Sequence, residues 1–349
     1  MIHKALIIGA GLSGLTAAYF LKKKGIDPLI LESRDRIGGR IHTLKTKTHN
    51  DLELGATWFN NGHKNLLALL DELELTYFEQ YQKGESTLVF NTMHKPHLFE
   101  TNPNDAPSFR IANGTKAIIN KLSGFVEDSI VLNQKVIQIE QKEDCLEITT
   151  DTNNIYKAEH VISTLPPRLV ADRITFTPQL DSDLVKAMHS THTWMGDAMK
   201  VVVSYKKPFW RDLAKSGMVI SQIGAVTEIY DHSNYQEDEF ALMGFINQNL
   251  RNYSKEDRKV EIINYLSTYL GAHATNFIDY NEKCWFLDPD TSIQNPEGVS
   301  MHLQYGDSAF SKSYMNNRLL FSGTETSQHF GGYMEGAVIS GIQIAKRFK

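Results

Sequence analysis

The 349-residue sequence has little cysteine, no excess of basic residues and no long apolar run, and each shortage excludes a class of protein. Its two cysteines, Cys145 and Cys284, provide neither a disulfide framework nor a cysteine-based metal site, and we expect no bound metal. A net charge of −5 argues against a nucleic-acid partner, which would need a basic patch. No stretch reaches the ~20 apolar residues of a membrane span, so we expect no membrane partner and a cytoplasmic location.

Glycines in a regular pattern mark the N-terminal segment. The apolar run Lys4–Gly9 predicts a buried strand, the residues after Gly11 predict a helix, and Asp27–Glu32 predicts a second buried strand. A strand, tight turn, helix and strand in this order form the βαβ unit that begins a doubly wound sheet. The same apolar start also has features of a secretory signal, but the glycine pattern and the acid that follows favour a folded unit.

The turn "GAGLSG" has the chemistry of a dinucleotide-binding loop. Gly9, Gly11 and Gly14 allow a tight turn, close approach of a pyrophosphate and close packing of helix on strand, and the helix N-terminus attracts the anion. Glu32 ends the second strand, where its carboxylate would accept both ribose hydroxyls, and this disfavours NADP. The pattern predicts dinucleotide binding without separating NAD from FAD.

A second glycine-rich segment, "ESRDRIGGRIHT", follows at once. Its Gly38–Gly39 pair permits close backbone approach, and Arg40 has the fixed fork of donors that suits a phosphate oxygen. A solvated charged loop is the alternative interpretation, but it leaves two glycines between arginines unexplained.

The order of these motifs resembles the flavin monoamine oxidase family. The chain reads "GAGLSG", Glu32, "RIGGR" and "GATW" (Gly55–Trp58), and further similar stretches are "VIQIE", "VISTLPP", "MGDAMKVVVSYKKPFW", Trp285 and "SGTETSQHFGGYMEGA". They extend from one end of the chain to the other. Each stretch alone is weak, whereas the combination is highly specific.

The resemblance implies that FAD is the cofactor. Glu32 is then expected at the adenosine ribose, the Val136 backbone at the adenine, Arg40 near the pyrophosphate, Thr57–Trp58 near the isoalloxazine, and Glu325 on the ribityl or phosphate side. The full set of cofactor contacts implied in this way is Gly9, Gly11, Leu12, Ser13, Gly14, Glu32, Ser33, Arg34, Gly39, Arg40, Ala56, Thr57, Trp58, Val136, Thr164, Trp285, Gly323, Glu325, Gly332, Tyr333 and Met334.

The C-terminal motif joins an acid, two glycines and the start of a helix. Gly331–Gly332 would let the backbone run against the flavin ring, and a helix beginning near Met334 would direct its dipole at the flavin N1–C2=O edge. Negative charge collects at that edge on reduction, so the helix end would stabilise reduced flavin. The alternative is a glycine-hinged helix that only closes the sheet.

Two residues are the expected catalytic groups. Lys200 lies in the otherwise apolar strand "MKVVVSY", where a lysine is costly without a partner. The resemblance implies that Lys200 holds a water at flavin N5, and the alternative is an edge-strand lysine that reaches solvent. Tyr333 matches one of the two aromatic rings that flank the substrate in amine oxidases. The second position falls on Val299, with Tyr305 the nearby substitute.

The chain departs from the family at the residue that binds flavin covalently. Aligned on the family, Gly298 or its neighbours fall where some members carry that cysteine, and Cys284 lies on the wrong side of Trp285. We therefore expect non-covalent FAD. The chain is also much shorter than typical members, and the loss falls in the substrate domain.

The expected fold is α/β, with a discontinuous Rossmann-type doubly wound FAD-binding domain and a smaller α+β substrate domain. The predicted FAD-binding parts are 1–62, 110–177 and 284–349, and the predicted substrate-domain parts are 63–109 and 178–283.

The sequence favours an FAD-dependent amine oxidoreductase that takes a small-molecule amine. It would transfer a hydride from a C–N bond to flavin N5, release an imine that hydrolyses, and use O₂ as electron acceptor with release of peroxide. A flavin-dependent desaturase or isomerase acting on C–C bonds is the alternative, because half of the aromatic cage is missing. A flavin-containing structural or sensor module is a third hypothesis, against which the intact Lys200 argues.

Overall fold

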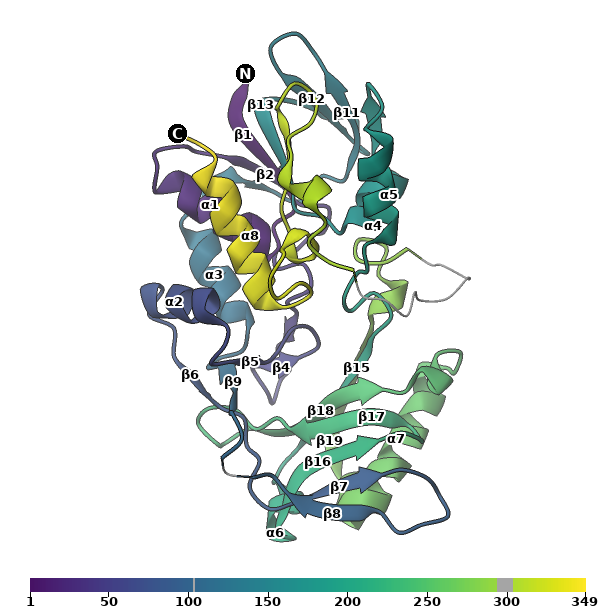
Figure 1. Ribbon diagram of the computed structural model, residues 1–349. Coiled ribbons are helices and arrows are strands. Elements are labelled where there is room, and N and C mark those ends of the chain that lie inside the picture. The colour runs from purple at the N-terminus through teal and green to yellow at the C-terminus, as the bar shows by residue number, and fades with distance from the viewer. Residues whose placement is uncertain (103, 294–303) are drawn as a thin grey trace.

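The computed structural model describes residues 1–102, 104–293 and 304–349, and two β-sheets organise them (Figure 1). The larger sheet has the order β10-β2-β1-β13-β12-β11-β14, with β20 also paired to β13. Pairing is parallel from β10 through β2 and β1 to β13 and β20. The strands are β1 (His3–Ile8), β2 (Leu29–Leu31), β10 (Ile130–Val131), β11 (Val136–Gln141), β12 (Leu146–Thr150), β13 (Ile155–Ser163), β14 (Thr175–Thr177) and β20 (Leu319–Phe321).

Helices cover both faces of this sheet because its central strands are apolar on both sides. Ala5 and Ile7 of β1 face a core shared with α1 (Leu12–Lys22), α3 (Lys116–Gly124) and α8 (Met334–Lys346). Leu6 and Ile8 face a second core shared with α4 (Pro167–Arg173) and α5 (Ser182–Ser190). Alternate residues of one strand thus enter opposite cores, as a doubly wound arrangement requires.

The second sheet has the order β19-β15-β18-β17-β16-β7-β8. Helix α7 (Lys255–Leu270) packs on one face, where its Ile262 and Leu266 belong to the same hydrophobic core as Val201 and Val203. On the opposite face, Val202 packs with Leu52 and Leu54. The strands are β7 (Glu85–Val89), β8 (His97–Glu100), β15 (Met199–Tyr205), β16 (Lys215–Ser221), β17 (Val226–Asp231), β18 (Phe240–Ile246) and β19 (Phe277–Cys284).

Short elements join the two sheets. Two small sheets pair β3 with β4, and β5 and β6 with β9. The remaining strands and α-helices are β3 (Thr43–Leu44), β4 (Leu52–Glu53), β5 (Phe59–Asn60), β6 (Tyr77–Glu79), β9 (Ser108–Ile111), α2 (Lys64–Glu72) and α6 (Phe209–Asp212). The 3₁₀ turns are η1 (Glu127–Ser129), η2 (Gln248–Leu250), η3 (Ala272–Thr275), η4 (Trp285–Leu287), η5 (Ser308–Ser311) and η6 (Thr324–Thr326).

The chain passes between the two sheets more than once. Strands β1, β2, β10–β14 and β20 lie within the ranges predicted for the FAD-binding domain, whereas β7, β8 and β15–β18 lie within those predicted for the substrate domain. The predicted boundary at residue 283 falls just before the last residue of β19. The exact domain limits stay a prediction. Within the described residues, no helix has both the length and the apolar character needed to cross a membrane.

Candidate functional site

A cavity of about 270 Å³ lies between the two sheets and is lined by both. The larger sheet contributes the turn after β1 and the end of β2, and the second sheet contributes β15, β17 and β18. The segment around Tyr333, before α8, closes a further part of the wall. The glycine turn and Lys200, which lie far apart in the sequence, therefore open into one space.

Glycine is required at the turn after β1 for two different reasons. Gly9 has φ of +105°, and a Cβ on Gly14 would lie 2.0 Å from the Gly9 carbonyl oxygen, so the protein itself excludes side chains there. A Cβ on Gly11 would instead meet no protein atom within 4 Å, although Gly11 lines the cavity. Helix α1 begins directly after Gly11, with no side-chain cap and no acid in its first turn. This bare, electropositive helix start fits an anionic group such as a pyrophosphate.

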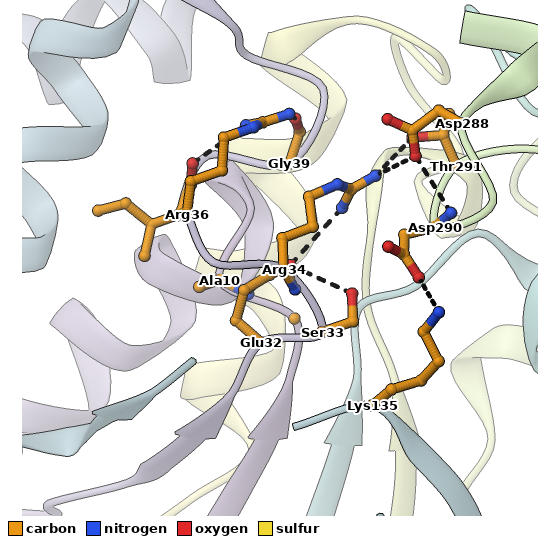
Figure 2. A network of polar contacts seen from close by, with 12 residues as sticks. Ala10, Glu32, Ser33, Arg34, Arg36, Gly39, Lys135, Asp288, Asp290 and Thr291 are labelled. Atoms are coloured by element: carbon orange, nitrogen blue, oxygen red, sulfur yellow. Dashed lines mark hydrogen bonds and ion pairs between the residues drawn. The ribbon is translucent and has the colours of Figure 1, made fainter. Parts of the chain in front are cut away.

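The carboxylate of Glu32 is fixed at the mouth of the same turn (Figure 2). It accepts hydrogen bonds from the backbone N–H groups of Ala10, at 2.8 Å, and Arg34, at 3.1 Å. The Ser33 hydroxyl donates to it as well, at 3.3 Å. Glu32 is buried but borders the cavity, which fits a carboxylate held rigid for a ligand hydroxyl.

Arg34 ties this region to the segment after β19, and Figure 2 shows the contacts. Its guanidinium donates to the Asp288 carboxylate at 2.7 Å and to the Thr291 hydroxyl at 2.9 Å. Lys283 lies 2.8 Å from the other Asp288 oxygen. Burial alone would raise the pKa of Asp288, but Lys283 and Arg34 together hold it at about 2. The Asp288 carboxylate therefore stays ionised near neutral pH, and its contacts fasten the two parts of the chain together.

Arg40 and Glu325 form an ion pair beside the cavity. The two guanidinium nitrogens of Arg40 lie 2.5 Å and 2.9 Å from the two carboxylate oxygens of Glu325, and Arg40 also donates to the Trp194 carbonyl at 3.0 Å. Glu325 is fully buried. The sequence predicted a cofactor contact for each residue, and these contacts stay predictions; the pairing of the two residues was not predicted. Only Arg40 of the two lines the cavity.

Lys200 is buried, with 1% of its surface exposed, and lies in the part of the cavity wall that the second sheet forms. Its ammonium group donates to the Gly55 carbonyl and to the Thr57 hydroxyl, both at 2.8 Å. The Trp58 and Phe245 rings lie 5.4 Å and 5.3 Å from the same nitrogen. Burial lowers the pKa of Lys200 to about 7. An amine with such a pKa can hold or release a proton near neutral pH.

Glu53 is a second buried ionisable group, and it accepts hydrogen bonds from the Thr115 backbone N–H, at 2.5 Å, and the Thr43 hydroxyl, at 2.8 Å. Burial raises the pKa of Glu53 to about 7, and the charge of Lys200 acts in the opposite direction. No direct ion pair joins the two residues in the described part of the chain. Each therefore acts on the pKa of the other through its charge, without direct contact.

The segment before α8 brings several rings together. A Cβ on Gly331 would lie 2.4 Å from the Cβ of Tyr305, so only glycine allows Tyr305 to pack there. Tyr333 is 55% exposed and borders the cavity, and its ring centroid lies 5.5 Å from that of His63. Tyr305 does not line the cavity, as far as the described residues show, and its expected role as a second substrate-facing ring gains no support. Val299 and Gly298 lie outside the described residues.

Most residues predicted for the site border the cavity. They are Gly9, Gly11, Leu12, Ser13, Glu32, Ser33, Arg34, Gly39, Arg40, Ala56, Thr57, Trp58, Thr164, Lys200, Gly323, Gly332, Tyr333 and Met334. Gly14, Val136, Trp285 and Glu325 are outside its described lining. Val136 lines a smaller neighbouring cavity of about 50 Å³ with Ser33, and the Trp285 indole donates to the Leu54 carbonyl at 2.7 Å. The roles assigned to all these residues stay predictions.

Sequence reasoning missed part of the wall. Glu228 and Phe245 come from β17 and β18, and Asp290 and Thr291 follow η4. Met195, which begins the motif that contains Lys200, and Trp194, which directly precedes it, also line the cavity, so that motif was a usable signal for this part of the wall. Nothing in the sequence marked Glu228, because an acid in an alternating strand normally faces solvent.

Comparison with known proteins agrees with this geometry. The pattern of the family described as flavin containing amine oxidoreductase matches residues 12–92 and 75–348. A probable flavin-containing monoamine oxidase A of Dictyostelium discoideum is 25% identical, and the alignment covers 100% of this chain and 98% of that protein. The human amine oxidase [flavin-containing] B is also 25% identical, over 98% of this chain and 85% of that protein.

Solved structures share the fold. A putrescine oxidase bound to putrescine superimposes with a TM-score of 0.86 at 22% identity, over 99% of both chains. A cyclohexylamine oxidase from Brevibacterium oxydans has a TM-score of 0.85 at 18% identity, over 99% of this chain and 98% of that one. The α/β expectation is confirmed. Amine oxidation has the support of these comparisons, and nothing in them favours the C–C desaturase alternative. The chain belongs to the family of flavin-containing amine oxidoreductases.

Proposed function

We propose that the cavity binds FAD non-covalently and that the protein oxidises a small amine with O₂ as electron acceptor. One observation carries the proposal: a single cavity is bordered by the glycine turn at α1 and by the buried amine of Lys200. A dinucleotide whose pyrophosphate met the turn would extend toward the second sheet. When bound, the flavin accepts two electrons from the substrate C–N bond and passes them to O₂, so that an imine and peroxide result.

The chain's own residues would bind and orient the reactants. The uncapped start of α1 and the space over Gly11 fit the pyrophosphate, and the rigid Glu32 carboxylate fits the ribose hydroxyls. Lys200 is held by Gly55 and Thr57 and would position a water or move a proton. The exposed face of Tyr333 would contact the substrate.

Non-covalent binding rests on the residues available for attachment. Cys145 is buried directly before β12, and Cys284 at the end of β19 is half-buried beside Arg258 and Glu282. Neither thiol borders the described cavity. Burial also raises the pKa of Cys284, which disfavours the reactive thiolate.

A peroxide-release assay with a panel of amines tests the proposed oxidation. Putrescine and cyclohexylamine are suitable first members, because the two structural neighbours are named for them. We expect peroxide in air and bleaching of the flavin absorbance under anaerobic conditions. A yellow protein whose flavin is bleached by no amine would contradict the proposal.

Lys200→Met provides the matched variant for the oxidative step. If Lys200 positions a water beside the flavin, the variant should keep its flavin while dithionite-reduced protein reoxidises roughly 10²-fold more slowly in air. Stopped-flow rates within a factor of about two would make Lys200 a structural residue.

A further inference from the structure

One carboxylate in the cavity wall belongs to the second sheet. Glu228 lies on β17, opposite Phe245 of β18, and Phe245 in turn lies opposite Lys200 of β15. Residues directly opposite each other in a sheet project from the same face. Neighbouring strands lie about 4.8 Å apart, so the backbones of Glu228 and Lys200 are separated by roughly 10 Å with Phe245 between them. All three side chains border the cavity.

Glu228 differs from the other acids of this wall in having no cation in direct contact among the described residues, although its charge acts at longer range to raise the pKa of Lys200. Glu32 is held by backbone N–H groups and lies 3.6 Å from Arg34, and Asp290 lies 2.8 Å from Lys135. Among the described residues, no lysine, arginine or histidine forms an ion pair with Glu228. A carboxylate that faces a cavity without its own counter-ion can accept one from a ligand.

The carboxylate is nevertheless held in a defined position. The Tyr230 hydroxyl donates to its Oε2 at 2.9 Å, and the other oxygen accepts no hydrogen bond within the described chain. Burial raises the pKa of Tyr230, and the Glu228 charge raises it further, so the hydroxyl stays protonated and keeps donating. One carboxylate oxygen is thereby fixed and the other is left for a ligand.

Aromatic rings surround the space between Glu228 and Lys200. The Trp58 and Tyr230 rings lie 5.0 Å apart, and Trp58 and Phe245 both lie next to the Lys200 ammonium. Such rings suit a methylene chain and tolerate a cation over their faces. The positive charge available to Lys200 would repel a second ligand cation, whereas Glu228 would attract it.

We propose that Glu228 forms a subsite for a second cationic group of the substrate, so that diamines and longer polyamines are preferred over monoamines. The subsite depends on the proposed oxidation in one respect: the reacting amine of the substrate lies at the Lys200 end of the cavity. The methylene chain between the two substrate nitrogens packs against Trp58 and Phe245. An ammonium group then completes the ion pair that Glu228 lacks.

Matched pairs of amines test the subsite. Butylamine is compared with putrescine, and pentylamine with cadaverine, in the flavin-loaded wild type and in Glu228→Gln. We expect the wild type to prefer each diamine, and the variant to lose about 10- to 100-fold in kcat/KM for diamines, the range for one hydrogen bond to a charged group. Monoamines should lose less than diamines, so that the diamine preference of the wild type falls by about the same 10- to 100-fold. Glu261→Gln, an exposed acid on α7, makes the same change in net charge and should leave both values unchanged.

Binding without turnover separates the subsite from the oxidation. Equilibrium dialysis of dithionite-reduced holoenzyme measures the affinity for each amine, because reduced flavin cannot oxidise it. A diamine preference that disappears in Glu228→Gln supports the subsite even if no amine is oxidised, which would sink the proposed function alone. Equal affinities for both members of a pair in the wild type, or an equal loss for both in Glu228→Gln, would overturn the subsite.

Discussion

Replacing Lys200 by methionine should stabilise the protein at pH 6. Burial lowers the pKa of this lysine from 10.5 to about 7, so the folded state binds the proton more weakly than the unfolded state does. A depressed lysine pKa costs stability in full below pH 7, and the cost fades as the pH rises toward 10.5. The interval between the two pKa values corresponds to about 5 kcal/mol.

Two losses oppose this gain. Methionine cannot donate to the Gly55 carbonyl or the Thr57 hydroxyl, and each hydrogen bond contributes about 1 kcal/mol. Glu53 does not alter the difference in unfolding free energy at pH 6. Burial raises its pKa to about 7, and losing Lys200 would raise that pKa further, so Glu53 is mainly protonated in both proteins. The net expectation is a gain of about 1–3 kcal/mol at pH 6. At pH 9 the remaining lysine cost is about 2 kcal/mol, which the lost hydrogen bonds cancel.

Urea unfolding at pH 6 and pH 9 measures the difference, with wild type and variant loaded with flavin to the same extent. Equal slopes against urea are required, because a changed slope would mean a changed unfolded or folded state. Lys121→Met is the control, since Lys121 is exposed on α3 and its loss should change stability by less than about 0.5 kcal/mol. No gain at pH 6, or the same gain at both pH values, would refute the assignment of a costly buried amine to Lys200.

Three further outcomes are expected. Acid or heat should release intact FAD into the supernatant, and flavin that remains with the precipitated chain would disprove non-covalent binding. Glu32→Ala should weaken FAD retention by roughly 10- to 100-fold, because the ribose loses its carboxylate, and full flavin occupancy after gel filtration would count against this role. Tyr333→Ala should lower amine turnover per bound flavin by roughly 10-fold while flavin content holds, and the reverse result would mean that Tyr333 serves the cofactor.

Local chemistry made much of this site predictable. The turn after β1 has to be glycine at Gly9 and Gly14 for steric reasons that the motif spacing expresses directly. Lys200 stood out because every residue of its strand except the lysine and Ser204 is apolar or aromatic, and the structure buries the whole strand. The start of α8 at Met334 was likewise predicted from adjacent residues alone.

Pairings between distant residues were not predictable in this way. Arg40 and Glu325 were each expected to contact the cofactor, yet 285 positions of chain separate two groups that bind each other. A fully buried carboxylate requires a cationic partner, and Arg40 is the one that the fold supplies. Neither motif carries information about the other, so only the assembled structure could show that the arginine fork is already engaged.

The sequence did not predict that Glu228 faces the cavity, because the alternating pattern of its strand suggests solvent exposure for an acid at this position. Buried and less buried residues alternate along much of β17, and an acid in such a strand is normally interpreted as facing water. The face on which Glu228 projects is indeed the less buried one, but the larger sheet lies opposite that face and encloses a cavity instead of open solvent. The strand register brings the three side chains together. Phe245 pairs with both Glu228 and Lys200, so an acid, a ring and an amine are aligned across three strands. A one-residue slip in either pairing would turn one of them to the α7 side, so the proposed second-cation subsite depends on strand register and not on any local motif.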